Sequence, residues 1–105
     1  MKKLIYVCSP YSGDDDFGKA ALHSICRFCL RQDVIPVSPS LYFSLLMDPR
    51  SRHSRDHAAA ASLELMKRCD EVWVFGEEST FAMAREITHA EMDNLKIRHF
   101  AREAR

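Results

Sequence analysis

The sequence predicts an α/β fold in which an open sheet of about four parallel strands, in the order 2-1-3-4, carries helices on both faces. Two observations lead to this prediction. Short apolar runs alternate along the chain with longer segments of helical periodicity. In addition, 105 residues with 47% apolar and 29% charged content suit one globular domain, expected over residues 1–105. Strands that alternate with helices pair in parallel through right-handed crossovers.

The first strand and helix are expected near the start of the chain. Residues 4–8 form an apolar run with no period of its own, which is typical of a strand covered on both faces. The run stops at residues 9–13, Ser-Pro-Tyr-Ser-Gly, which favour a turn. Aspartates at 14–16 can cap a helix, and apolar residues then recur at helical spacing to about Arg31.

The second strand is expected at an edge of the sheet. Residues 34–37 are apolar, but Pro36 lacks the N–H group that a strand ladder uses, and an edge strand tolerates this loss best. Residues 41–47 follow as a short helix. Residues 48–55, which include Pro49, form the most polar stretch of the chain and predict a mobile loop.

The second half of the chain completes the alternation. A third helix is expected over residues 56–68, which are rich in alanine. Residues 72–75 are wholly apolar and predict a central, buried strand. A last helix, which the hydroxyl of Ser79 or Thr80 can cap, runs to about Asn94. Residues 97–100 predict a final, weaker strand.

Open sheets of this Rossmann-like or flavodoxin-like kind bind ligands beyond the carboxyl ends of their strands, where the strand order reverses. In the predicted order this point lies between the first and third strands. The turns after these strands, and the start of the last helix with its free N–H groups, should line a pocket that favours an anion. The residues expected to bind a substrate there are Ser9, Pro10, Tyr11, Ser12, Gly13, Gly76, Thr80, Ala82 and Met83.

Charge and cysteine content narrow the classes of function. The 15 basic and 15 acidic residues balance, which disfavours binding to duplex nucleic acid. No apolar stretch has the length of a membrane span, so we expect no membrane partner. Three of the four cysteines lie in apolar segments, where a thiol packs as a small hydrophobic group. A reducing, cytoplasmic location is therefore expected.

We expect neither a metal ion nor another cofactor. Cys26 and Cys29 have the spacing of a redox or zinc pair, but both fall late in the first helix and no second pair has matching spacing. His53 and His57 could share one helix face, but Pro49 and the polar composition argue against a helix, and no third ligand is evident.

Three arginines fall in the expected loop, at Arg50, Arg52 and Arg55. Together they could clamp a phosphate group, which would suit a nucleotide better than a nucleoside. The alternative is that the loop is merely solvated.

Three segments together resemble the nucleoside 2-deoxyribosyltransferase superfamily. They read IYVCSPYSG at residues 5–13, CDEVWVFG at 69–76 and TFAMAREITHA at 80–90. The resemblance spans nearly the whole chain and is strongest to short bacterial and phage domains that begin with the same SPYSG-type turn and have no assigned function. It implies a nucleoside or nucleotide ligand. It also implies a homodimer or larger homo-oligomer, for which residues 41–47 offer an apolar surface.

The resemblance also implies catalytic residues. Glu86 stands at the place of the nucleophile, whose carboxylate attacks the anomeric carbon to form a covalent glycosyl-enzyme. Tyr6 matches a tyrosine that holds this glutamate by a hydrogen bond, and Asp70 matches an aspartate that lines the sugar and base site. Each residue has a plainer alternative: a solvated helix carboxylate, a core aromatic residue and a turn aspartate that caps local backbone.

Two residues depart from the pattern of the superfamily. Ala82 replaces a glycine four residues before the nucleophile, and its methyl group narrows the approach of a substrate. Ser62 replaces an aspartate that helps to protonate the departing base. We expect a hydrolase or transferase that acts on an N-glycosidic bond, and the two departures favour hydrolysis or binding over deoxyribosyl transfer. The alternatives are a nucleotide-binding or sensing module without turnover and a purely structural role.

Overall fold

The computed structural model of the protein describes residues 1–48 and 50–100. Within them, strands and helices follow one another as β1 (Leu4–Cys8), α1 (Asp16–Arg31), β2 (Ile35–Val37), α2 (Pro39–Leu46), α3 (Arg52–Lys67), β3 (Glu71–Phe75), α4 (Phe81–Met92) and β4 (Lys96–Phe100). The strands form one parallel sheet in the order β2-β1-β3-β4, so the predicted topology is confirmed.

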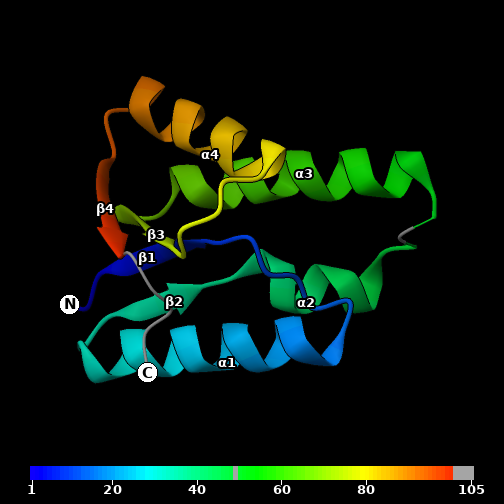
Figure 1. Ribbon diagram of the computed structural model, residues 1–105. Helices are drawn as coiled ribbons and strands as arrows, with labels where there is room; N and C mark the ends of the chain where they lie inside the picture. Colours follow the sequence, from blue (N-terminus) through cyan, green and yellow to red (C-terminus); the bar gives the residue numbers. More distant parts are fainter. Residues whose placement is uncertain (49, 101–105) are drawn as a thin grey trace.

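Helices cover both faces of the sheet (Figure 1). Because successive residues of a strand point to opposite faces, β1 and β3 contribute to two apolar cores. Tyr6 and Cys8 pack with α3 and α4 on one face, whereas Ile5 and Val7 pack with α1 on the other. The side chain of Tyr6 therefore lies under α3 and α4.

The strands are placed as their composition predicts. Every residue of β3 is buried, as expected for a central strand, and Tyr6 of β1 is paired with Val72 across the ladder. The short strand β2 contains Pro36 and lies at one edge, while β4 forms the other edge and has both exposed and partly buried residues. The edge position of β2 agrees with the prediction from Pro36, which cannot donate a hydrogen bond to a strand ladder.

The predicted loop over residues 48–55 is wrong in its second half, because α3 begins at Arg52. The Ser51 hydroxyl accepts a hydrogen bond from the Ser54 backbone N–H at 3.2 Å and caps the helix. His53 and His57 consequently share this helix, with ring centroids 6.2 Å apart. Among the described residues no cluster of three or more metal-ligating side chains is present. Pro49, used in the prediction of the loop, lies outside the described residues.

Three further observations bear on the remaining predictions. The cysteines are free, and Cys8, Cys29 and Cys69 are buried. Within residues 1–48 and 50–100, no helix has the length and apolar character needed to cross a membrane. On α2, Leu45 and Leu46 are 73% and 72% exposed, so an apolar surface does exist there. Assembly of several copies through it stays a prediction.

Candidate functional site

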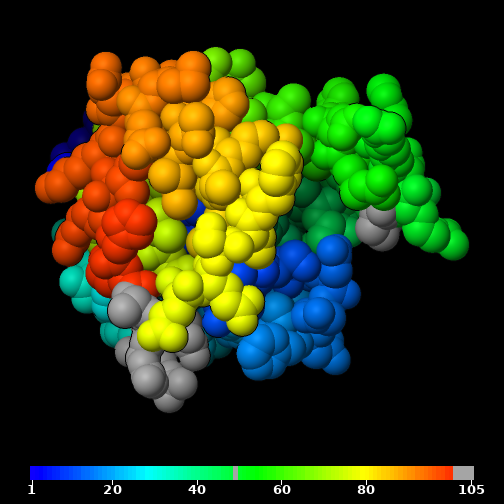
Figure 2. Space-filling view, turned by 45° about the horizontal axis from the view of Figure 1, so that its top comes forward, coloured from blue at the N-terminus to red at the C-terminus, as the bar shows by residue number. Residues whose placement is uncertain are grey.

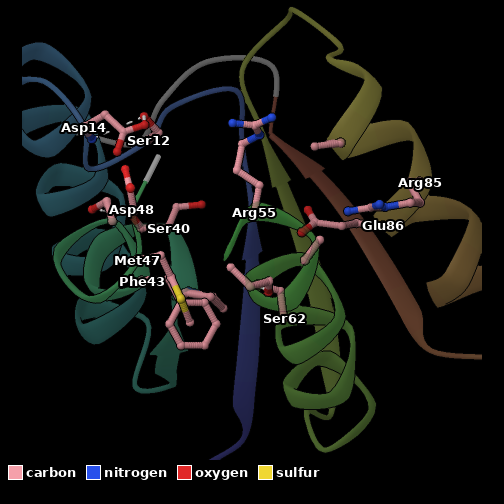
Figure 3. Close-up of a pocket in the computed structure, with 15 residues that line it drawn as sticks. Ser12, Asp14, Ser40, Phe43, Met47, Asp48, Arg55, Ser62, Arg85 and Glu86 are labelled. Atoms are coloured by element: carbon pink, nitrogen blue, oxygen red, sulfur yellow. Dashed lines mark hydrogen bonds between the residues drawn. The ribbon is translucent and has the colours of Figure 1, made fainter. Parts of the chain in front are cut away.

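A pocket of about 370 Å³ lies where the segments that follow β1, β2 and β3 meet (Figure 3). In the space-filling view, the loop after β1, the helices α2 and α3 and the start of α4 gather on one side of the molecule (Figure 2). The residues lining the pocket are Ser12, Asp14, Pro39, Ser40, Phe43, Ser44, Met47, Asp48, Arg55, Ala58, Ala59, Ser62, Ala82, Arg85 and Glu86. This position, beyond the carboxyl ends of the strands, is the one that the sheet topology predicts.

Glu86 forms part of one wall, on the second turn of α4. The helix starts where it does because the Thr80 hydroxyl accepts a hydrogen bond from the Met83 backbone N–H at 3.1 Å. The hydroxyl of Tyr6, from the middle of β1, donates a hydrogen bond of 2.6 Å to Oε2 of Glu86. The carboxylate is thus held between the pocket and the sheet.

Other polar side chains surround this pair. The thiol of Cys8, two residues along β1, interacts electrostatically with Glu86, and Ser62 of α3 interacts with the Tyr6 hydroxyl. Ser62 itself donates to the backbone carbonyl of Ala58 at 2.9 Å. Two strand residues and two helix residues therefore form a small polar cluster beside the otherwise apolar core between the sheet and the helices α3 and α4.

The electrostatics of the cluster follow from burial. Desolvation raises the pKa of the Glu86 carboxyl above its ordinary value, although the hydrogen bond from Tyr6, the interaction with Cys8 and the charge of Arg85 act in the opposite direction. Burial, followed by the negative charge of Glu86, raises the pKa of both the Tyr6 hydroxyl and the Cys8 thiol. Both groups therefore stay protonated, and the Tyr6 hydroxyl acts as a donor to the carboxylate.

The structure brings only some of the expected substrate-binding residues to the pocket. Ser12 and Ala82 line it, together with Glu86. Thr80 caps α4, and Met83 is 2% exposed and belongs to the core, so its assignment to the pocket wall was wrong. The other expected residues, absent from the lining, are Ser9, Pro10, Tyr11, Gly13 and Gly76.

Several of these residues lie next to the pocket lining and stabilise the loops that carry it. The backbone N–H of Gly13 donates to the Ser40 carbonyl at 3.0 Å, which fixes the loop after β1 against the start of α2. Gly76 has a φ of 89°, a left-handed conformation that side chains disfavour, and a Cβ there would approach Pro10. The hydroxyl of Ser9 accepts a hydrogen bond from the Tyr11 N–H at 3.3 Å.

Asp70 is not part of the pocket, which corrects the expectation drawn from the resemblance. It precedes β3 and therefore lies at the amino edge of the sheet, whereas the pocket lies at the carboxyl edge. Its carboxylate accepts the Leu4 backbone N–H at 2.8 Å, and its own N–H donates to the Leu4 carbonyl at the same distance. The plainer alternative, a turn aspartate that caps local backbone, describes what Asp70 does.

The sequence did not indicate the pocket wall formed by α2, whereas it did single out Arg55 and Ser62, which lie on α3. Phe43 and Met47 of α2 give an apolar surface, and Arg55 of α3 reaches the pocket (Figure 3). The remaining arginines of the expected clamp do not line it. Nε of Arg50 lies 3.7 Å from Oδ1 of Asp48, and Nε of Arg52 lies 3.8 Å from Oδ2 of Asp56. The cluster of basic residues was the available signal for Arg55.

Comparisons with known proteins give a family and a fold. A family model described as a domain of unknown function, DUF7768, matches residues 3–100. Among solved structures, a 2-deoxyribosyltransferase of the psychrotolerant bacterium Bacillus psychrosaccharolyticus, described as a biocatalyst for nucleoside synthesis, superposes with a TM-score of 0.76 at 16% sequence identity. The match covers 93% of this chain and 72% of that one. No curated protein sequence matches. At this identity the similarity establishes the α/β fold.

Proposed function

Since the chain belongs to the DUF7768 family of unknown function, we propose its activity from the pocket: the protein cleaves the N-glycosidic bond of a nucleoside or nucleotide, with Glu86 as nucleophile. The observation that carries this proposal is the Tyr6–Glu86 hydrogen bond of 2.6 Å at the pocket wall. A carboxylate that burial makes costly to ionise, held by a core tyrosine and facing a cavity, is typical of a functional site.

The chemistry proceeds in two displacements at the anomeric carbon. A carboxylate oxygen of Glu86 bonds to this carbon while the bond to the base nitrogen breaks, and the electron pair departs on the base, which takes up a proton from water. Water then bonds to the same carbon, loses a proton to the solvent and releases the Glu86 carboxylate. The product is a free sugar of retained configuration. If a second base replaces water, the same site acts as a transferase.

In the proposed reaction, some residues position Glu86 and others bind the substrate. Tyr6 positions Glu86, because its hydroxyl fixes Oε2 from below. Phe43 and Met47 offer an apolar surface on which a base can stack, and the hydroxyl of Ser12 can face a sugar. A volume of about 370 Å³ lies within the range of small-molecule sites.

Release of free base tests the proposal. The purified protein is incubated with ribo- and deoxynucleosides, their monophosphates and dinucleotides, and free base is quantified by chromatography. We expect release by the wild type and loss of at least about 1000-fold in Glu86→Gln, because the amide is not a nucleophile. Glu91→Gln is the matched control, since Glu91 is an exposed glutamate of the same helix outside the pocket. No release by the wild type, or equal release by Glu86→Gln, contradicts the proposal.

A second candidate function, nucleotide binding or sensing without turnover, draws support from Ser62. This hydroxyl lines the pocket where the resemblance places an acid, and a hydroxyl does not protonate a departing base at neutral pH as a carboxylic acid does. A thermal shift with intact ligand recovered afterwards favours the binding module, because a ligand that binds only the folded state stabilises it.

A further inference from the structure

Two arginines line the same pocket as Glu86. Arg55 comes from the first turn of α3 and Arg85 from α4, next to the proposed nucleophile. A guanidinium group presents planar, permanently charged donors that match the oxygens of a phosphate group. A neutral nucleoside offers such donors no anionic partner, so the pair of arginines bears on which ligand the pocket takes.

The position of Arg55 along the pocket is informative (Figure 3). Its guanidinium group lies at one end, whereas the Phe43 ring and Ser62 lie toward the other, and the Glu86 carboxylate lies between these ends. In a nucleoside 5′-monophosphate the base and the phosphate-bearing carbon are attached at opposite ends of the sugar ring. A base against Phe43 would therefore leave the anomeric carbon near Glu86 and direct the phosphate toward Arg55.

The pocket also contains two acidic residues, Asp14 and Asp48, and each has a polar partner near it in the sequence. Asp48 accepts a hydrogen bond from the Arg50 backbone N–H at 3.0 Å, and the Arg50 side chain lies 3.7 Å from it. Asp14 accepts from the Ser12 hydroxyl at 3.3 Å. Both carboxylates lie across the pocket from Glu86 and Arg85 (Figure 3).

We infer that the pocket is built for a nucleoside 5′-monophosphate rather than a nucleoside, with Arg55 and Arg85 as the phosphate-binding residues. This inference rests on the proposed function because it concerns the ligand of the same pocket. It goes further in assigning the phosphate to the end of the cavity formed by the first turn of α3, where Arg55 lies, and in making the phosphate the main determinant of affinity.

Calorimetric titration in about 0.15 M salt tests the inference. The Glu86→Gln protein serves as host, so that ligands stay intact, and each nucleoside is compared with its own 5′-monophosphate. A charge-assisted contact of this kind predicts about tenfold to hundredfold tighter binding of the monophosphate. Adding Arg55→Gln or Arg85→Gln should abolish most of the difference. Arg52→Gln, a matched change on the same helix turn outside the pocket, should leave it intact.

The outcomes separate this inference from the proposed function. Equal affinity for a nucleoside and its monophosphate overturns the inference, as does a preference that survives both Arg55→Gln and Arg85→Gln. No measurable binding of any monophosphate also overturns it. A monophosphate preference that depends on these arginines supports it, even when the wild type releases no base. Conversely, base release at equal rates from nucleosides and monophosphates, with equal affinities, leaves the proposed function standing and removes the inference.

Discussion

Substituting phenylalanine for Tyr6 tests the central contact of the pocket. The change removes one hydroxyl and keeps the ring, which is 2% exposed and packs in the core. The lost hydrogen bond, 2.6 Å long, favours the ionised form of Glu86. A hydrogen bond to a charged group contributes about 1.5–3 kcal/mol, so the ionised fraction of Glu86 at a given acidic pH should fall by roughly 10- to 100-fold. In the proposed reaction, only the ionised carboxylate attacks the anomeric carbon.

The assay is kcat/KM for base release as a function of pH. In Tyr6→Phe the acidic limb of the profile should move to higher pH, because the pKa of Glu86, already raised by burial, rises further. Activity at alkaline pH should be largely retained. Tyr42→Phe is the control, since Tyr42 is 39% exposed and lies outside the pocket lining. An unchanged profile, or an equal loss at every pH, refutes the reasoning that Tyr6 acts through the ionisation of Glu86.

Three further predictions concern stability, measured by urea denaturation. Glu86→Gln should be more stable than the wild type at neutral pH and lose this advantage at acidic pH. The pKa of Glu86 is raised in the folded state, so the stability of the wild type falls as the pH rises above the ordinary glutamate range. A variant that is less stable than the wild type at neutral pH contradicts this. Glu71→Ala should cost about 1–3 kcal/mol at neutral pH, because the Trp73 indole N–H, 2.9 Å from Glu71, loses its acceptor. Since Lys3 and Trp73 lower the pKa of Glu71, this difference should shrink as the wild-type carboxyl is protonated at acidic pH, and a pH-independent difference counts against it. Gly76→Ala should cost about 1–2 kcal/mol, because the φ of 89° is strained for alanine, and an unchanged midpoint contradicts it.

The sheet could be predicted because its signals are local. The unbroken apolar runs at residues 4–8 and 72–75 identify buried strands, and Pro36 identifies an edge. The start of α3 was missed because its first turn contains no apolar residue to show a period. The capping hydroxyl of Ser51 was the local signal for this start, and it competed with a polar composition that equally suits a loop.

The pocket was only partly predictable because its walls depend on packing between distant segments. Phe43 and Met47 line the pocket because of how α2 packs against the rest of the fold. The residues around them in the sequence do not indicate this packing. Asp70 shows the opposite case. A residue that precedes a parallel strand lies at the amino edge of the sheet, so the predicted topology itself excluded Asp70 from a pocket at the carboxyl edge.

Two carboxylates, one in strand β3 and one on helix α4, have environments that the structure distinguishes and the sequence does not. Glu71 accepts a hydrogen bond of 2.9 Å from the indole N–H of Trp73. Glu86 accepts one of 2.6 Å from the hydroxyl of Tyr6. Lys3 pairs with Glu71 at 2.8 Å, so the pKa of Glu71 is lowered and its charge is satisfied within the protein. Burial dominates at Glu86 instead, raises its pKa and leaves it facing a cavity. A carboxylate whose charge the protein does not fully compensate remains available to interact with a ligand. This difference in environment indicates a structural role for Glu71 and supports a chemical role for Glu86.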